Sequence, residues 1–280
     1  MESAGIPAHP WDLAAEGWNR HAGLIENWLA KVTDAMLAAA DVRAGAAVLD
    51  VAAGSGGQTL AAARRVGTGG KVLATDISPR ILALAQGNAQ AAGLVQIETR
   101  VADAQALGLE GAGFDAAISR LGLMFCAQPE RAFASIAAAL RPGGRLAVVV
   151  FSQPQANPCV AILMATALRH AGRQPGVPFA PGTLFSLGRS EMLESLARDA
   201  GFAEIEITPV SAPMRLPSAE HYLEFVRSSG SPIMEILAPL SPAAQQQAWD
   251  DMARTLAQFD VPGGWVGPNE LLLCSGRRQP

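Results

Sequence analysis

The stretch VLDVAAGSGGQTL at residues 48–60 decides the fold of this chain. An apolar run carries Asp50 near its end, a turn of small residues follows, and a helix-like segment begins near residue 57. Glycines in such a turn let the backbone approach a ligand closely, and the start of a helix offers free N–H groups. The spacing D-x-A-x-G-x-G differs from the GxGxxG turn that holds a pyrophosphate, because it puts an acid inside the motif. That acid would repel a phosphate but suits an ammonium group, so the motif disfavours a nicotinamide cofactor.

Short β-branched runs alternate with Ala/Leu-rich helical segments from Ala46 to Phe151. Strands that alternate with helices of this length predict βαβ units and a parallel sheet. Ser78-Pro79 favours a helix start, and the Pro-Gly-Gly at 142–144 favours a helix stop. This part of the chain is therefore predicted to be α/β. The expected strands are 46–51, 71–76, 95–103, 114–119 and 145–151, and the expected helices are 57–66, 79–92 and 129–140.

The rest of the chain is predicted to add helices and two strands around this unit. Long connections of this kind in α/β enzymes often build lids or binding walls. The expected helices are one or two within 11–40, one at 158–171, one at 189–200, and two or three within 218–260. The expected strands are 203–210 and a closing strand in LLLC at 271–274.

Two further acids follow the next strand-like runs. Asp76 ends the run in LATDIS, 26 residues after Asp50, where a carboxylate can accept hydrogen bonds from both hydroxyls of a ribose. Asp103, in VADAQAL, ends the third run, where a side chain can bind the exocyclic amine of an adenine. Each acid alone could equally be a helix N-cap or a loop residue. Together with the glycine turn they indicate one ligand site along the carboxyl edge of a parallel sheet.

Composition excludes several classes of protein. Of the 280 residues 50% are hydrophobic and 16% are charged, so the chain can bury a sizeable core and is not expected to be disordered. A net charge of −4 disfavours a nucleic-acid-binding protein, which normally carries a basic excess on one face. Three widely spaced cysteines without a CxxC pair favour a reducing cytoplasm. With neither a signal-peptide pattern nor an apolar run of ~20 residues, we expect a cytoplasmic protein without a membrane span.

These motifs resemble the class I S-adenosylmethionine-dependent methyltransferases, in the broad group that includes the ubiquinone/menaquinone C-methyltransferases. The resemblance covers residues 46–151: VLDVAAGSGG, LATDIS, VADAQAL, FDAAISRLGLMF and LRPGGRLAVVVF each match a family segment. One departure is Ala52, where the family pattern has its first glycine; alanine keeps the turn small, so binding is expected to survive. The resemblance implies a Rossmann-like α/β fold with a seven-stranded, mostly parallel sheet whose last strand is antiparallel, which fits the LLLC segment.

The resemblance also implies which residues bind S-adenosyl-L-methionine. For Arg120 the alternative to a cofactor contact is a surface salt bridge. For Gln58 and Thr59 the alternative is capping of the helix that they begin. Trp18 lies on an N-terminal helix that often folds over the cofactor in such enzymes, with ordinary packing as the alternative. The implied contacts are Asp50 and the backbone of Ala52, Gly54 and Gly56 for the methionine part, Gln58 and Thr59 for its carboxylate, Asp76 and Ile77 for the ribose and adenine, Asp103 and Ala104 for the adenine, and Arg120 with Leu121 beside the sulfonium.

Histidines are the candidates for a general base, should the acceptor have to lose a proton. His21 follows Trp18 by one helical turn, and His170 and His221 lie in the two insertions, although a solvated or hydrogen-bonded histidine is the commoner case. The fourth, His9, is expected in a flexible N-terminal tail. No metal is expected, because the histidines and cysteines lack ligand spacing. Cys126 is expected to be an ordinary buried thiol and not a nucleophile.

The sequence thus predicts in-line methyl transfer to a small, hydrophobic or aromatic metabolite, because the insertions are rich in apolar and aromatic residues. A dimer interface would need the same surface, so a homodimer is a further expectation. SRLG, at residues 119–122, stands at the end of the expected strand 114–119 where base-modifying amino-methyltransferases have an NPPY-type tetrad, which disfavours nucleic acid as the acceptor. The alternatives are other chemistry with the bound cofactor on the same fold, or a non-catalytic cofactor-binding protein. We expect one domain over 1–280, with a helical lid at 1–40, a cofactor-binding core at 41–151, and acceptor-binding insertions at 152–188 and 211–263.

Overall fold

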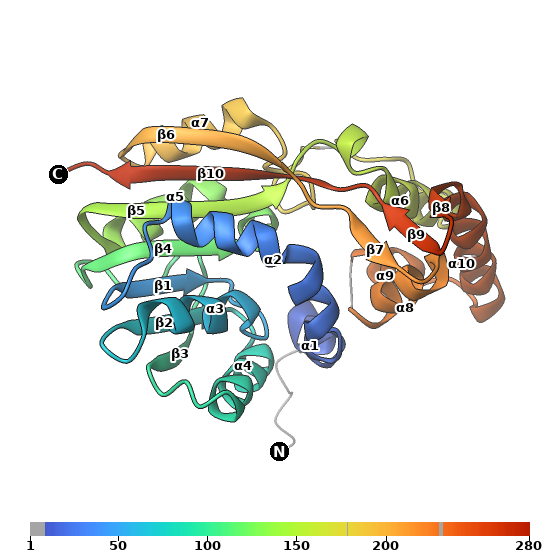
Figure 1. The fold of residues 1–280 in the computed structure, drawn as a ribbon. Helices are drawn as coiled ribbons and strands as arrows, with labels where there is room; N and C mark the ends of the chain where they lie inside the picture. The colour runs from blue at the N-terminus through green and yellow to red at the C-terminus, as the bar shows by residue number, and fades with distance from the viewer. Residues whose placement is uncertain (1–8, 178, 230–231) are drawn as a thin grey trace, which may run out of the picture.

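A seven-stranded sheet forms the centre of the computed structural model, which describes residues 9–177, 179–229 and 232–280 (Figure 1). Its order is β3-β2-β1-β4-β5-β10-β6, and β10 runs antiparallel to both of its neighbours. The strands β1 to β5 pair in parallel with one another, as β3–β2, β2–β1, β1–β4 and β4–β5. The strands are β1 (Ala47–Val51), β2 (Lys71–Asp76), β3 (Ile97–Val101), β4 (Phe114–Arg120), β5 (Leu140–Phe151), β6 (Phe202–Ser211) and β10 (Glu270–Arg278).

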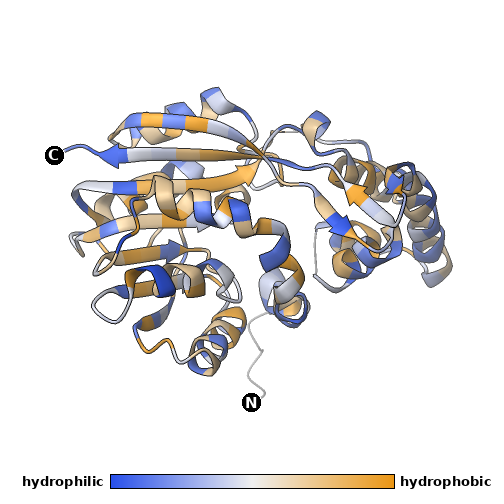
Figure 2. Ribbon diagram, viewed as in Figure 1, coloured by the Kyte–Doolittle hydropathy of each residue, from blue (hydrophilic) through white to orange (hydrophobic). Residues whose placement is uncertain are grey.

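Helices cover both faces of this sheet, because its central strands are apolar on both sides. Residues 146–150 of β5 have no exposed surface. In Figure 1, α2 and α3 lie together in front of the sheet, and α5 and α7 contact each other behind it. Figure 2 shows hydrophobic residues concentrated along the central strands. The helices are α2 (Ala22–Ala39), α3 (Gly57–Val66), α4 (Pro79–Ala91), α5 (Pro129–Ala139) and α7 (Ser190–Asp199).

Local signals in the sequence account for most element boundaries. Ser78 caps α4, since its Oγ accepts the Ile81 N–H at 3.1 Å and Pro79 occupies the first helical position. Helix α5 ends at Ala139, before the Pro-Gly-Gly, and the chain enters β5 at once. The third strand is shorter than expected, spanning 97–101 instead of 95–103. Asp103 therefore lies beyond β3, in a turn that an isolated bridge to Ala106 closes.

The remaining elements form a cap, which we define as α6 (Pro158–His170), α8 (Ala219–Ser228), α9 (Pro232–Leu237), α10 (Pro242–Leu256) and a small sheet. The sheet has the order β7-β9-β8, from β7 (Met214–Leu216), β8 (Asp260–Val261) and β9 (Gly264–Gly267). These three strands have no signal in the sequence, because segments of two to four residues are too short to show a periodicity. The ring of Tyr222 stacks on Trp265 at a centroid distance of 5.0 Å, which joins α8 to this sheet.

Helix α1 (Pro10–Arg20) lies between the central sheet and the cap (Figure 1). Its Asp12 carboxylate accepts a hydrogen bond from the Ser78 hydroxyl at the start of α4. On the other side Gly17 lies so close to the end of α8 that a Cβ there would meet the Ser228 carbonyl oxygen at 1.5 Å. Among the described residues, no helix is long and apolar enough to cross a membrane.

Candidate functional site

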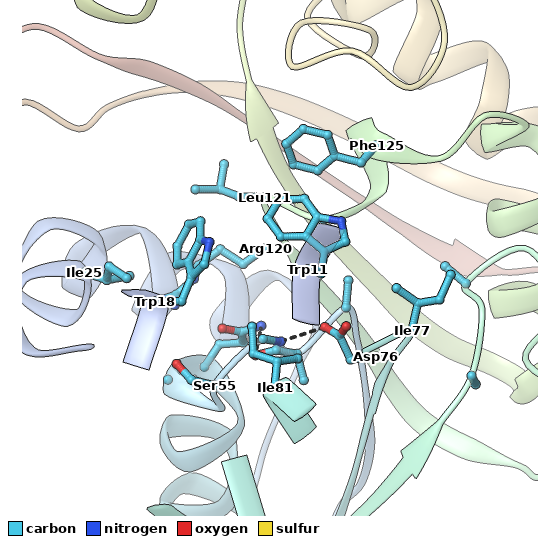
Figure 3. Close-up of a pocket in the computed structure, with 18 of the residues that line it drawn as sticks. Trp11, Trp18, Ile25, Ser55, Asp76, Ile77, Ile81, Arg120, Leu121 and Phe125 are labelled. Atoms are coloured by element: carbon cyan, nitrogen blue, oxygen red, sulfur yellow. Dashed lines mark hydrogen bonds between the residues drawn. The ribbon is translucent and has the colours of Figure 1, made fainter. Parts of the chain in front are cut away.

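Two cavities meet at the carboxyl edge of the central sheet. The first cavity has a volume of about 190 Å³ and lies between α1, α2 and the turns that follow β1, β2, β3 and β4. The second cavity has a volume of about 100 Å³ and lies between the cap, α1, α2 and the end of β5. Four residues line both: Trp11, Trp18, Leu121 and Phe125. In Figure 3 the two tryptophans stand above Asp76 in the first cavity.

The turn after β1 brings backbone to the wall of the first cavity. Ala52 and Gly54 line it, with φ angles of +57° and +58°. The left-handed conformation costs a residue with a Cβ about 1–2 kcal/mol, which explains the glycine in the family pattern at position 52. Gly56, with φ +93°, instead faces α4, where a Cβ would lie 3.2 Å from the Ala85 Cβ. Gly56 therefore shapes the turn and does not line either cavity.

Asp50 lies beneath this turn, fully buried, and is not part of either cavity wall. Its carboxylate accepts hydrogen bonds from Thr59 Oγ1 at 2.6 Å and Gln58 Nε2 at 3.2 Å. Burial raises its pKa to about 7, and the bonds from Thr59 and Gln58 oppose that rise. Gln58 also lines the first cavity, whereas Thr59 does not. Asp50 thus holds the first turn of α3 in place.

Asp76 presents a carboxylate to the first cavity from the end of β2. Oδ2 accepts the Gly54 N–H at 3.0 Å (Figure 3). Oδ1 accepts the Ser78 N–H, also at 3.0 Å. Burial raises the pKa of Asp76, and these backbone donors oppose the rise. A carboxylate has about four acceptor sites, so both oxygens keep capacity for a hydroxyl donor. Ile77 lines the same wall and is 40% exposed.

The segment after β3 forms the far wall of the first cavity. Asp103 and Ala104 both line it. The Asp103 carboxylate accepts the Gln105 backbone N–H at 2.8 Å, which closes the turn. Gln105 also lines the cavity, although it is not among the residues predicted from the sequence to contact a ligand. Its place within the quoted VADAQAL motif is the signal that could have found it.

Arg120, at the end of β4, is the cation of the first cavity wall. Its Nη1 donates to Thr33 Oγ1 at 2.6 Å, and its Nη2 lies 3.1 Å from where a Cβ on Gly57 would be. Within the part of the chain that the structure describes, no carboxylate forms an ion pair with it. Burial lowers the pKa of Arg120 to about 10, against the attraction of Asp50 and Glu26. The guanidinium therefore reaches toward the start of α3, where helix N–H groups add to its attraction for an anion.

Helix α1 contributes Trp11 and Trp18 to the wall of the first cavity. Trp18 packs edge-on against Phe225 of α8, with a centroid distance of 5.9 Å, and Trp11 packs edge-on against Phe125 at 5.0 Å. His9 also lines the cavity and caps α1, since its Nδ1 accepts the Trp11 N–H at 3.3 Å. The expectation of a flexible tail at His9 is therefore wrong, because this cap ties it to the helix.

The three histidines considered as bases line neither cavity. His21 lies at the junction of α1 and α2, where Nδ1 is 3.0 Å from the Gly17 carbonyl oxygen. His221 sits on α8 with Nδ1 2.9 Å from Ser218 Oγ, and His170 pairs with Asp251. Cys126 lines the first cavity, but burial raises the pKa of its thiol to about 12, which keeps it protonated at neutral pH.

The second cavity is almost wholly apolar. Its walls include Met124 of the short helix after β4, Phe151 at the end of β5, and Leu163 of α6. Trp28 of α2 closes one side, and its Nε1 donates to the Ala212 carbonyl at 2.7 Å. The polar side chains in this wall are few, so a ligand here is held mainly by apolar contact.

Comparison with known proteins identifies the part of the chain that builds the first cavity. A family model described as a methyltransferase domain matches residues 48–144. An uncharacterized protein of Mycobacterium tuberculosis is 36% identical over 129 residues, which cover 46% of this chain and 46% of that protein. The ubiquinone/menaquinone biosynthesis C-methyltransferase UbiE of Hahella chejuensis is 39% identical over 121 residues, or 43% of this chain and 48% of that protein. The chain thus spans about half the length of the curated relatives it matches.

Solved structures match over nearly the whole chain. Phosphoethanolamine N-methyltransferase 2 of Haemonchus contortus, in complex with S-adenosyl-L-methionine, has a TM-score of 0.61 at 17% identity and covers 100% of this chain and 62% of that chain. The cyclase SpnF has a TM-score of 0.58 at 20% identity and covers 99% of both chains. The comparisons confirm the family resemblance and the fold that the sequence predicts.

Proposed function

We propose that this chain, which has the fold of the class I S-adenosylmethionine-dependent methyltransferases, binds S-adenosylmethionine in the first cavity. We propose further that it methylates a small apolar or aromatic molecule held in the second cavity. S-adenosylmethionine is the cofactor that the domain match and the fold support. A single observation carries the proposal: a cavity edged by charged groups and an almost wholly apolar cavity join at four shared residues.

The nucleoside end of the cofactor fits the wall formed after β2 and β3. Asp76 has one backbone donor on each oxygen, which leaves acceptor capacity for both ribose hydroxyls. Asp103 and Ala104 lie beyond it, where an adenine would stack against Ile77. We assign the adenine amine to Asp103 on this ground.

The amino-acid end fits the wall between α2 and the start of α3. Arg120 offers free guanidinium N–H groups beside the first turn of α3, which together suit a carboxylate. Glu26 lines the same region and suits the ammonium. A guanidinium would repel a sulfonium, so the Arg120 side chain serves the carboxylate and not the sulfonium. Asp50 acts only through Gln58 and Thr59, by fixing the helix start.

The transfer takes place at the junction between Trp11, Trp18, Leu121 and Phe125. When bound, S-adenosylmethionine supplies an electrophilic methyl group on a sulfonium sulfur. The chemistry that it would supply at this junction is in-line transfer of that methyl group to a nucleophilic atom of the acceptor, with a neutral thioether as the leaving group. These residues hold the acceptor in line and exclude water, and such alignment can be worth roughly 7–11 kcal/mol.

His21 and His221 take no part in proton transfer, because neither side chain lines either cavity. An acceptor that is already ionised at neutral pH needs no base. Tyr222 lines the second cavity, but burial raises the pKa of its phenol, so it does not act as a base at neutral pH.

Turnover with methyl-labelled cofactor tests this function. The purified chain is incubated with the cofactor and a panel of phenols, quinones and carboxylates, and release of S-adenosylhomocysteine is followed. Label transfer to an apolar member of the panel supports the proposal. Cofactor binding without transfer across the panel would favour the alternatives, namely other chemistry on the same fold or a non-catalytic binding protein.

A further inference from the structure

The wall of the second cavity contains Tyr222, the one tyrosine of the chain. The residue is only 5% exposed, and its hydroxyl forms no hydrogen bond with any residue that the structure describes. Among those residues, the buried polar side-chain atoms that lack both a partner and accessible surface are Trp18 Nε1, Ser119 Oγ, Arg227 Nε and Asn269 Oδ1. The Tyr222 hydroxyl differs from these four atoms, because it lacks a partner but keeps accessible surface. Of the two cavities Tyr222 lines the second alone, so this surface opens onto it.

The ring of Tyr222 is held in place from outside the cavity. It stacks on Trp265, with a centroid distance of 5.0 Å and an angle of 22° between the ring planes. Trp265 lines neither cavity, is 1% exposed, and donates its Nε1 to the Leu256 carbonyl at 2.9 Å. A side chain that packing already holds loses little freedom when a ligand binds, which favours affinity.

The free group of Tyr222 is a hydrogen-bond donor. Burial raises the pKa of its phenol, so the O–H stays protonated at neutral pH. Other donors of the same wall are already used, since Ser229 Oγ donates to the Val226 carbonyl at 3.2 Å and Trp28 Nε1 donates to the Ala212 carbonyl at 2.7 Å. Ser229 and Trp28 each have a single polar hydrogen, so neither has one left for a ligand. An apolar cavity that presents an unused O–H favours a ligand with an oxygen to accept it.

We infer that Tyr222 is a specificity residue, whose O–H donates a hydrogen bond to a carbonyl oxygen of the acceptor molecule. This inference rests on the proposed function, in which the second cavity holds the acceptor. Tyr222 does not line the first cavity, so the oxygen that it binds differs from the atom that is methylated at the junction. The acceptor is then an aromatic molecule with a nucleophile at one end and a carbonyl group at the other.

Helix α8 sets the separation of these two ends. Phe225 lines the cavity one turn after Tyr222 and packs edge-on against Trp18 of the junction, at a centroid distance of 5.9 Å. Three residues of helix rise by about 4.5 Å, so Tyr222 lies beyond Phe225 by roughly the length of one ring. Trp28 and Phe151 also line the cavity, and aromatic walls favour a flat ligand.

Calorimetry with a matched pair of ligands tests this inference. The full chain is saturated with S-adenosylhomocysteine and titrated with 7-hydroxy-1-tetralone and with 5,6,7,8-tetrahydro-2-naphthol. The two ligands share one carbon skeleton and one phenol, and the first has a carbonyl group where the second has a methylene group. Tyr222→Phe keeps the stacked ring and removes the hydroxyl. It should weaken binding of the ketone about tenfold and change binding of the naphthol by less than about twofold.

Ser229→Ala is the matched control, because it removes a hydroxyl from the same wall whose O–H is already used. Both ligands should bind this variant within about twofold of the wild type. Unchanged ketone binding in Tyr222→Phe, or the same loss for both ligands, would overturn the inference and leave the proposed function standing. Binding of neither ligand to the wild type would overturn the assignment of the second cavity to the acceptor, and the inference with it. Binding of S-adenosylhomocysteine is measured first, so a defective cofactor site is recognised separately as failure of the proposed function.

Discussion

Replacing Arg120 by methionine should weaken binding of the amino-acid end of the cofactor and leave the nucleoside end unaffected. Methionine keeps an unbranched side chain and removes the guanidinium that donates to Thr33 Oγ1. Thr33 keeps a partner in the variant, because its hydroxyl donates to the Leu29 carbonyl at 2.9 Å. The substitution therefore removes a positive charge beside the start of α3 with little change in packing.

The size of the effect follows from the surroundings of the guanidinium. A hydrogen bond to a charged group contributes about 1.5–3 kcal/mol, and truncating one member of a buried charged pair costs about 2–5 kcal/mol. Arg120 has one hydrogen-bonded partner among the described residues, so several of its N–H groups are free for a carboxylate. The nearby Glu26 carboxylate offsets part of this attraction. We expect a loss of about 2.7 kcal/mol, which is about 100-fold in Kd.

Calorimetry with two ligands measures this loss. S-adenosylhomocysteine carries the amino-acid end, whereas 5′-methylthioadenosine keeps the adenine, the ribose and the sulfur but lacks that end. Arg120→Met should bind S-adenosylhomocysteine about 100-fold more weakly than the wild type and 5′-methylthioadenosine within about twofold. An equal loss for both ligands, or none for either, would refute the assignment of Arg120 to the carboxylate.

Five further substitutions test other parts of the structure. Asp76→Ala should weaken both ligands by about 100-fold, because two hydroxyl donors lose a charged acceptor; equal affinity of variant and wild type would rule out the ribose assignment. Gly122→Ala should lower the free energy of unfolding by about 1–3 kcal/mol, since its Cβ would lie 2.3 Å from the Ala52 Cβ. Adding Ala52→Gly should restore most of that stability in thermal unfolding, and no rescue would contradict the contact. The raised pKa of Asp50 means that the folded state binds the proton more tightly than the unfolded state, so its contribution to stability grows as pH falls from 8 toward 5.5. For a folded pKa of about 7 this gain is about 2 kcal/mol, and urea unfolding should show it in the wild type but not in Asp50→Asn. His221→Ala should leave the pH profile of turnover unchanged, because His221 lies outside both cavities; a displaced profile would restore it as a candidate base.

The sequence alone predicts the central sheet and the part of the first cavity wall that follows β2 and β3. Strands such as 46–51 and 145–151 are recognisable because a strand buried on both faces is apolar along its whole length. Helix α4 is recognisable because Ser78, its cap, is its neighbour in the chain. Asp76 is recognisable because the carboxyl ends of parallel strands must meet at one edge. Each of these signals lies within a few residues of the structure that it determines.

The tertiary structure decides what the side chains of the site do. Arg120 reaches Thr33, 87 residues earlier in the chain, and no local pattern carries that contact. Asp50 matches the family motif, yet Gln58 and Thr59 occupy its carboxylate beneath the turn. The same holds for the histidines, whose candidacy depends on the direction of a side chain and not on its position in the sequence.

The second cavity exists only in the folded chain. Its walls bring Trp28 of α2 together with Asn269, which lies more than 200 residues away, through a chain of hydrogen bonds that passes Ala212. The burial of Asn269 is a property of that packing, because an asparagine in a sequence shows neither its burial nor its partners. Local chemistry therefore determines the strands, the turn and the acids at the carboxyl edge of the sheet. Contacts between distant segments determine the second cavity, because burial and hydrogen-bond satisfaction depend on every element packed around a residue.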